Sequence, residues 1–275
     1  IIFYIFTYFI MNIMITTLKS PFDERDYTID KLSNKNFPSV LDLTEKLPKV
    51  RNQGSQGSCA AHTAACIKEW QELMDIGFYE YMSPQFIYNN RENQDSEGMY
   101  PRDVMKILNK LGCCSETSYP YGTIEDPKNI DSKIYQEASK YKIKKYARIY
   151  TIDGLKNALF NHGPCLIAVP VYNYTGRMWK QRDGDTYNGG HAMTVVGYNN
   201  NGFLIRNSWG NDWCNNGYTT LDYNDWDLIW EVWSTIDEKT IIDQEKEKEE
   251  EDTKKNDKNE NEDSICSKFF KLIFG

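Results

Sequence analysis

The chain has 275 residues, of which 40% are hydrophobic and 14% aromatic, and its formal net charge is −8 at pH 7. This much apolar material is ample for a buried core, so the composition excludes a wholly disordered chain. The sequence contains no internal repeat, no Cys/His cluster with zinc spacing, no phosphate-binding loop and no basic patch. We therefore expect no metal or other cofactor and no nucleic-acid partner.

The chain begins with an uncharged segment, Ile1 to Leu18, that is rich in Ile, Phe, Tyr and Met. About 18 residues is the lower limit for a membrane span, and no positively charged region precedes the segment as a secretory signal would require. Met11 offers a second interpretation, in which it is the real start and the chain begins near Thr16. Two interpretations of this segment therefore stay open: it is a signal or membrane anchor, or the start of the chain is wrongly assigned. Residues 19–36 then form a short polar segment.

The stretch from Arg51 to Asp75 joins a polar, glycine-containing loop to an Ala-rich run. Its apolar positions 59, 63, 66, 67, 70 and 74 recur at helical spacing, which predicts a helix with Cys59 in its first turn. Ser58 is a natural N-cap. The helix N-terminus favours a thiolate over a thiol, and a cysteine there that is paired with an imidazolium can have a pKa of roughly 3 to 4. This pattern predicts that Cys59 is a nucleophile.

The following segments predict helices first and strands later. The expected elements are helices at 83–89 and 102–110, a strand at 141–150, a short helix at 153–161 and a buried strand at 165–172. This order predicts an α+β fold of two lobes, one helical and one rich in β-strands, with an active site in the groove between them.

A β-hairpin is predicted after these elements. Residues 191–198 and 203–210 are rich in strand-forming residues and are joined by Asn199-Asn200-Asn201-Gly202. A hairpin would bring Asn207 back to within a rung or two of His191.

Of the three histidines in the chain, His191 is the candidate partner of Cys59. His62 lies three residues after Cys59 on the same helix, where it leaves no gap for a substrate, so we interpret it as a packing or surface residue. His162 lies in the turn-like sequence Asn161-His162-Gly163-Pro164 and is interpreted in the same way.

These motifs resemble the papain-like cysteine peptidases of the C1 family. Gln53 precedes Cys59 by six residues in a Gly-Ser-Cys context, and His191 follows Cys59 by 132 residues, close to the family's spacing. Asn207 follows 16 residues later in Asn-Ser-Trp-Gly. The pattern is closest to bacterial and large-virus members, and it departs from the common Cys-Gly-Ser-Cys-Trp motif at Gln56 and Ala60.

The resemblance implies the following roles for five residues. Cys59 attacks the scissile carbonyl, and His191 protonates the departing amine and later activates water to hydrolyse the thioester. Asn207 orients the imidazole, under the cover of Trp209. The Gln53 side-chain amide and the Cys59 backbone N–H form the oxyanion hole.

Gly98 and Gly190 are the expected substrate-binding positions. The family places a glycine-rich wall of its cleft near Gly98, and Gly190 leaves the wall beside His191 bare. Phe37-Pro38 resembles the family's mature N-terminus, so any inhibitory segment ahead of it is short. The resemblance covers about residues 37–236.

The cysteines do not form a recognisable disulfide framework. There are seven of them, and Cys66 is expected to be plain core. The positions where secreted relatives carry disulfide partners are here Gln56, Asn90 and, roughly, Ser96. We therefore expect an intracellular, reducing compartment, with membrane or endomembrane association left open.

The C-terminal part differs in composition from the rest. Residues 237–263 contain 13 acidic and 6 basic residues, which predicts a disordered tail over 237–264. Residues 265–275 are amphipathic and would span only about 16 Å as a helix, so they are too short to cross a bilayer. Ile265–Gly275, with Cys266 as an acylation site, or Ile1–Leu18 could contact a membrane.

The sequence thus predicts four parts, bounded at 1–36, 37–236, 237–264 and 265–275. The expected function is a monomeric cysteine peptidase, an endopeptidase or close variant, that acts on protein or peptide substrates. Two alternatives stay open: a catalytically silent papain-fold binding module tethered by its tail, and an acyltransferase or transglutaminase-like Cys-His enzyme.

Overall fold

The computed structural model describes residues 15–28 and 37–237. The predictions for residues 1–14, for the acidic tail beyond Asp237 and for the C-terminal segment 265–275 lie outside these ranges. Among the described residues, no helix is both long enough and apolar enough to cross a membrane.

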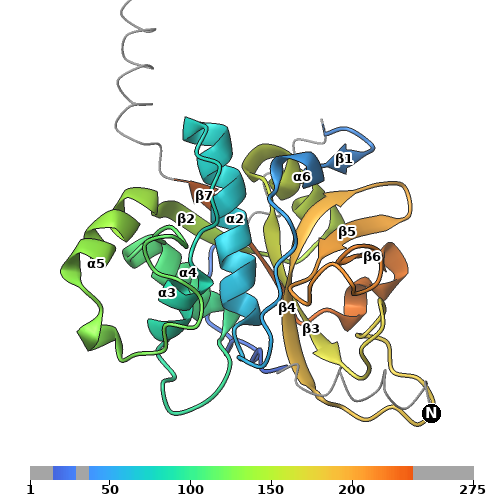
Figure 1. Cartoon of the computed structure of the whole chain (residues 1–275). Coiled ribbons are helices and arrows are strands. Elements are labelled where there is room, and N and C mark those ends of the chain that lie inside the picture. Colours follow the sequence, from blue (N-terminus) through green and yellow to red (C-terminus); the bar gives the residue numbers. More distant parts are fainter. Residues whose placement is uncertain (1–14, 29–36, 238–275) are drawn as a thin grey trace, which may run out of the picture. The chain divides into compact units, whose positions relative to one another are not determined.

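The first half of the domain is mainly helical (Figure 1). Its longest helix, α2, runs from Cys59 to Ile76 and ends at Gly77, whose φ of 71° is the left-handed conformation that glycine adopts without strain. The shorter elements around it are α3 (Pro84–Asn89), α4 (Pro101–Lys110), α5 (Ser132–Ala138) and the 3₁₀ turns η1 (Thr44–Lys46), η2 (Pro127–Asn129) and η3 (Ser139–Tyr141). The predicted helix at 83–89 corresponds to α3, which begins with a capping residue, since the Ser83 side chain accepts a hydrogen bond from the Phe86 N–H.

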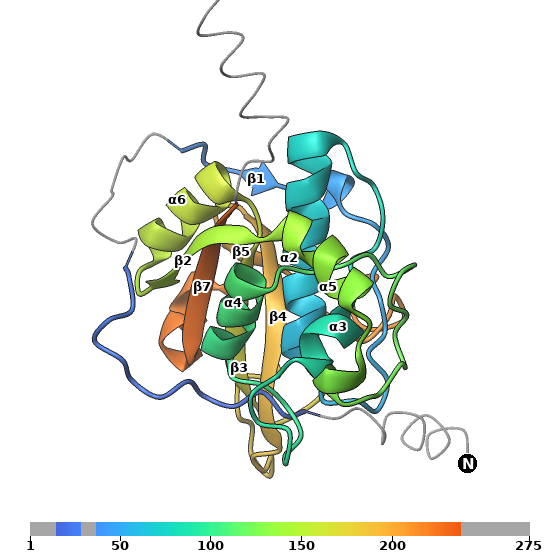
Figure 2. The ribbon, with the colours of Figure 1, turned by 90° about the vertical axis from the view of Figure 1, so that its left-hand side faces the viewer.

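The second half forms a seven-stranded antiparallel sheet with one helix, α6 (Ile152–His162), and one 3₁₀ turn, η4 (Tyr223–Leu228). The order across the sheet is β2-β7-β3-β4-β5-β6, and the short β1 pairs with β4 (Figure 2). The strands are β1 (Leu41–Asp42), β2 (Ile143–Ile149), β3 (Cys165–Val171), β4 (Gly189–Tyr198), β5 (Gly202–Arg206), β6 (Tyr218–Asp222) and β7 (Glu231–Asp237). The predicted α+β class is confirmed, and every side chain of β3 is buried, as its apolar run predicted.

Two main hydrophobic clusters correspond to the two predicted lobes. One joins the sheet to α6 and contains Trp179 and Phe203. The other joins α2 to α4 and to the facing side of the sheet, where Trp233 contributes. Helix α2 therefore lies at the junction, and its first turn faces β4, the strand that carries His191.

The predicted hairpin is formed by β4 and β5. Thr194 pairs with Arg206, and Tyr198 pairs with Phe203. Asn207 is the residue directly after Arg206. This register returns Asn207 to the neighbourhood of His191.

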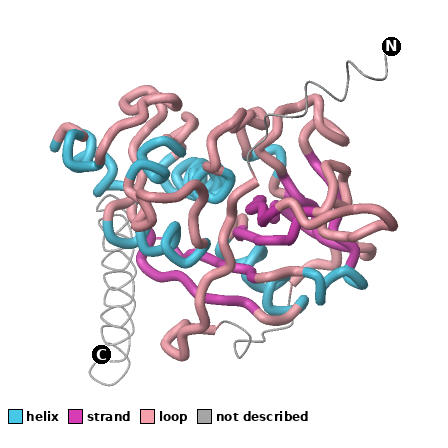
Figure 3. Tube along the Cα trace, turned by 90° about the horizontal axis from the view of Figure 1, so that it is seen from below, coloured by secondary structure: helices cyan, strands magenta, loops and turns pink. Residues whose placement is uncertain are grey.

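Residues 15–28 lie across the lower side of the domain instead of extending away from it. In Figure 2 this segment is the darkest blue trace, which passes below β3 and β4 and rises beside β7. Seen from below, this face of the domain shows many loops (Figure 3). Its Ile15, Thr17 and Ser20 are buried.

Candidate active site

Cys59 is the first residue of α2 and is completely buried. Ser58 holds the N-cap position, but its side chain makes no capping hydrogen bond. Its hydroxyl instead lies 2.6 Å from the Tyr121 hydroxyl and 3.3 Å from Nδ1 of His62. The prediction of a side-chain cap was therefore wrong, because a tertiary partner competes for the hydroxyl.

His191 and Asn207 meet as the hairpin register requires. Nε2 of His191 lies 2.7 Å from Oδ1 of Asn207, and both side chains are buried. The indole of Trp209 stacks against the imidazole, with 4.5 Å between ring centroids and an interplanar angle of 31°. The His191–Asn207 bond is thus shielded on one side by an aromatic plane.

The thiol of Cys59 is set for ionisation near neutral pH. Burial raises its pKa, but the charge and side chain of His191, the Thr17 hydroxyl and the Ala192 backbone lower it, to a net value of about 7 from an ordinary 9.0. Nδ1 of His191 has no hydrogen-bond partner among the described residues. It is the ring nitrogen left for the thiol or a leaving group.

Gln53 is held in a fixed orientation beside the start of α2. Its Oε1 accepts a hydrogen bond from Ser208 Oγ at 2.6 Å, and its Nε2 donates to the Gln56 carbonyl at 3.0 Å. Its backbone carbonyl accepts from Tyr121 Oη at 2.8 Å. The side-chain amide is therefore oriented before any substrate binds.

The cleft itself is occupied by the chain's own residues 15–18. Oγ1 of Thr17 lies 2.8 Å from Sγ of Cys59. The Thr17 N–H donates to the Gly190 carbonyl at 2.8 Å, and the Leu18 N–H donates to the Met99 carbonyl at 3.1 Å. This segment passes between the two lobes in an extended form.

The two glycines predicted to bind substrate flank this segment. A Cβ on Gly98 would clash with the Thr16 carbonyl, and one on Gly190 would clash with the Thr17 carbonyl. Gly98 also has a φ of +86°. Both positions thus require glycine, because a main chain passes directly over them.

Buried polar contacts anchor the segment further along. The Asp26 carboxylate accepts from Nε of Arg102 at 2.9 Å, and Arg148 lies 3.9 Å from it. All three side chains are at most 10% exposed. The Ser20 N–H also donates to the Glu231 carboxylate at 2.7 Å, so the anchors come from α4, β2 and β7.

Sequence reasoning missed this arrangement. It placed residues 19–36 in a short polar segment and did not locate the segment in the cleft. Asp26 lies in the charged stretch Asp23-Glu24-Arg25-Asp26, and its basic partners Arg102 and Arg148 lie on later elements. The pairing joins residues at least 76 positions apart, and such pairs are not visible in local patterns.

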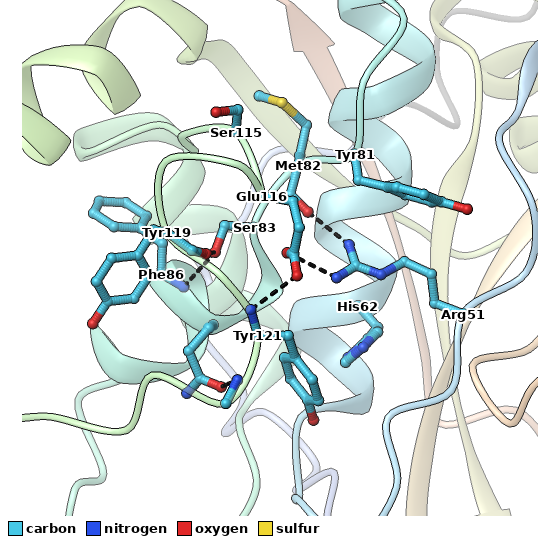
Figure 4. A network of polar contacts seen from close by, with 12 residues as sticks. Arg51, His62, Tyr81, Met82, Ser83, Phe86, Ser115, Glu116, Tyr119 and Tyr121 are labelled. Carbon is cyan, nitrogen blue, oxygen red and sulfur yellow. Dashed lines mark hydrogen bonds and ion pairs between the residues drawn. The ribbon is translucent and has the colours of Figure 1, made fainter.

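The other histidines lie outside this site. His162 is the last residue of α6, and Gly163 is the C-cap of that helix. His62 is buried on α2 near Arg51 and Tyr121 (Figure 4). Of the two alternatives expected for His62, packing or surface, the structure therefore supports packing.

Comparison with known proteins gives a consistent result. A model of the papain family of cysteine proteases matches residues 37–229. An uncharacterized peptidase C1-like protein of Acanthamoeba polyphaga mimivirus is 31% identical, over 75% of this chain and 80% of that protein. Papain of Carica papaya is 28% identical, over 68% of this chain and 55% of papain.

Among solved structures, xylellain, a cysteine protease from Xylella fastidiosa, matches with a TM-score of 0.70 and 29% identity, covering 82% of this chain and 96% of xylellain. A viral and a bacterial relative agree with the expectation drawn from the sequence pattern. The comparisons favour an active peptidase over the catalytically silent binding module. Because the family match spans most of the chain and the fold agrees, this protein belongs to the papain family of cysteine proteases and is a hydrolase of peptide bonds.

Proposed function

We propose that Cys59, His191, Asn207 and Gln53 carry the reaction in the roles that the sequence suggested. The observation that carries this proposal is the 2.7 Å contact between His191 Nε2 and Asn207 Oδ1, which leaves Nδ1 of the same ring without a protein partner among the described residues. The Cys59 thiolate attacks the carbonyl carbon, and the imidazolium gives its proton to the leaving amine. Water then attacks the thioester with the imidazole as base. The product acid leaves and the thiol is restored.

The oxyanion formed in each step needs two donors. The Gln53 amide and the Cys59 backbone N–H at the start of α2 are suited to this role, because Gln53 is already held by Ser208 and Tyr121. Trp209 would keep water off the His191–Asn207 bond.

The substrate is an extended stretch of a protein or peptide. Residues 17 and 18 use only backbone N–H groups to bind the Gly190 and Met99 carbonyls. A substrate main chain can use the same acceptors, so the cleft binds peptides of varied sequence in an extended form.

Residues 15–28 are proposed to keep the enzyme latent. A hydroxyl, not a carbonyl carbon, faces the Cys59 thiol, and the Thr17 carbonyl is packed over Gly190. The segment therefore fills the cleft without offering a bond for attack. Activation requires the segment to leave.

The Asp26 anchor provides the test. In the full chain, Asp26→Ala leaves Arg102 and Arg148 without their carboxylate, so we expect hydrolysis of a quenched fluorescent protein substrate to rise at least tenfold over the wild-type rate. Asp23→Ala is the matched control, because Asp23 lies in the same segment and, among the described residues, its carboxylate forms an ion pair with the exposed Arg25 alone. This variant should leave the rate unchanged. Adding Cys59→Ala to Asp26→Ala should abolish hydrolysis.

The outcomes separate the two parts of the proposal. A wild-type rate equal to that of Asp26→Ala would refute latency and leave the catalytic roles intact. Persistent hydrolysis after Cys59→Ala would refute the catalytic roles. Incorporation of an amine acceptor without hydrolysis would favour the acyltransferase alternative.

We also propose that the enzyme works as a monomer in a reducing, intracellular compartment. Six cysteines in the described ranges are free thiols, and five of them are buried. A peptidase whose nucleophile is a thiol benefits from such surroundings. Association with a membrane through either apolar end remains a prediction, tested by flotation of the full chain with anionic vesicles.

A further inference from the structure

A small polar cavity lies beside Asn207 and Ser208, which are among its lining residues. Its volume is about 20 Å³, and His62, Asn207 and Glu69 are among the residues that line it. A buried water molecule needs roughly 10–15 Å³ of such space and two to four polar partners. The cavity is therefore the size of one water molecule.

Three buried polar atoms belong to the residues that line this cavity. Nε2 of His62, Nδ2 of Asn207 and Oε2 of Glu69 have no hydrogen-bond partner among the residues that the structure describes. Leaving a buried polar group unpaired is unfavourable, so three such groups around one cavity point to a shared ligand. A single water molecule can accept one hydrogen bond and donate two.

The imidazole of His62 is oriented for this task. Nδ1 lies 3.1 Å from the Ser58 carbonyl and donates to it, and the ring packs edge to face on Tyr121 with 4.8 Å between centroids. Figure 4 shows the ring between Arg51 and Tyr121. Burial and the Arg51 charge lower its pKa to about 3. The ring is therefore neutral, and Nε2 is an acceptor.

Asn207 has the complementary requirement. Its Oδ1 accepts from His191 and from the Ser208 N–H at 2.7 Å, so its amide NH₂ must donate elsewhere. If the amide flipped, the NH₂ would face these two donors and both hydrogen bonds would be lost. A hydrogen-bond acceptor on the NH₂ side resists that flip.

We propose that His62 is a positioning residue for catalysis, which holds the Asn207 amide in its productive orientation through one water molecule in this cavity. The water accepts a hydrogen bond from Nδ2 of Asn207 and donates to Nε2 of His62 and to Glu69. His62 touches no substrate, and its effect reaches the thiolate only through Asn207 and His191.

The other charged or titratable groups around the cavity are Arg51, Arg206, Glu69 and Cys66. The arginines and Cys66 do not replace His62 as an acceptor, because an arginine is a donor only and burial raises the pKa of the Cys66 thiol to about 11. Glu69 accepts from the Met82 N–H through Oε1 at 3.2 Å, and its Oε2 is the second acceptor that the water reaches. His62 is thus the ring acceptor of the set.

The kinetic test rests on the proposed release of the cleft, so its variants are made in the full chain carrying Asp26→Ala. His62→Phe removes the acceptor and keeps a ring against Tyr121, whereas His62→Gln retains an acceptor. We expect His62→Phe to lower kcat about tenfold with little change in KM, and to move the alkaline limb of the kcat/KM profile to lower pH, because a loosened Asn207 supports the imidazolium less well. His62→Gln should stay within about threefold of the parent. Cys66→Ala, a change to the cavity wall that removes no acceptor, should leave kcat and the pH profile unchanged.

The structural test uses the wild-type full chain and needs no activity. A high-resolution crystal structure should show one water molecule within hydrogen-bond distance of both Nε2 of His62 and Nδ2 of Asn207. A dry cavity, or a water that contacts only one of the two, would overturn the proposal. So would equal kcat and equal pH profiles for His62→Phe and the parent. If His62→Phe does not fold, the crystal structure decides alone, and if Asp26→Ala is inactive, the failure lies in the proposed latency.

Discussion

The Thr17 hydroxyl lies 2.8 Å from the Cys59 sulfur, so the proposed nucleophile is in contact with residues 15–18 of its own chain. The contact covers the sulfur, and the hydrogen bond helps to lower the pKa of the thiol. The proposed nucleophile is therefore ionisable and covered at the same time.

The pH dependence of alkylation at Cys59 is the most direct prediction. In Asp26→Ala, iodoacetamide labelling should rise with a midpoint below the ordinary thiol pKa of 9.0, because the His191 charge lowers the pKa of Cys59. Adding His191→Ala should move the midpoint to higher pH, since that charge is gone. Peptide mass mapping measures this. Cys66, whose pKa burial raises to about 11, is an internal control that should not label at pH 7, and labelling of both cysteines in parallel would contradict the assignment.

Loss of the Gln53 amide should slow chemistry more than binding. Gln53→Ala in the released chain is expected to lower kcat by about 10²- to 10³-fold, the usual cost of one oxyanion-hole donor, with KM changed little. Gln56→Ala is the control from the same loop, because its side chain bonds Gln85 instead. Equal losses in the two variants would mean that the loop, not the amide, matters.

The cover provided by Trp209 is testable with graded substitutions. Trp209→Phe retains an aromatic plane over His191, while Trp209→Ala admits water to the His191–Asn207 bond. We expect kcat near the parent value for the first and a loss of about 5- to 150-fold for the second, which corresponds to about 1–3 kcal/mol. Circular dichroism establishes that each variant is folded. If kcat followed only the folded fraction, the indole would have a packing role alone.

Stability should fall as the pH rises through the neutral range because of Glu69. Burial raises its pKa to about 7 from 4.5, more than the Arg51 and Arg206 charges lower it. Between these values the folded state binds the proton and the unfolded state does not, so the free energy of unfolding decreases with pH by about 3 kcal/mol. Urea denaturation of wild type at pH 4.5 and pH 8 measures this change. Glu69→Gln should reduce this change, whereas Glu45→Gln, at the exposed η1 turn, should behave like wild type.

Local patterns were enough to predict most elements of the domain. The apolar spacing around Cys59 predicted α2 to its first residue, and Ser83 with Pro84 predicted α3, because helix starts are determined by side chains one to three positions away. The Asn/Gly turn after Tyr198 predicted the hairpin. The register of that hairpin in the structure places Asn207 near His191.

Features that depend on distant partners were not predictable in this way. Ser58 looked like a cap, yet Tyr121, 63 residues later, takes its hydroxyl. Residues 15–18 looked like the end of an apolar terminal segment, and their position in the cleft depends on Asp26 and Arg102, on Ser20 and Glu231, and on the carbonyls of Gly190 and Met99. The role proposed for His62 was also hidden, because the cavity it shares with Asn207 exists only after α2 packs on the β4–β5 hairpin.

The segment over the cleft is part of the same polypeptide, and this determines how it competes with substrate. A tethered ligand acts at an effective concentration on the order of millimolar, whatever the concentration of the enzyme. Dilution therefore cannot open the cleft, and a weak-binding substrate at micromolar level cannot displace the segment. Cleavage of one bond between Thr28 and Phe37 changes this competition, because the segment then becomes a separate peptide that dissociates on dilution. On the proposed latency, cleavage of one bond between residues 28 and 37 is therefore enough to activate the enzyme.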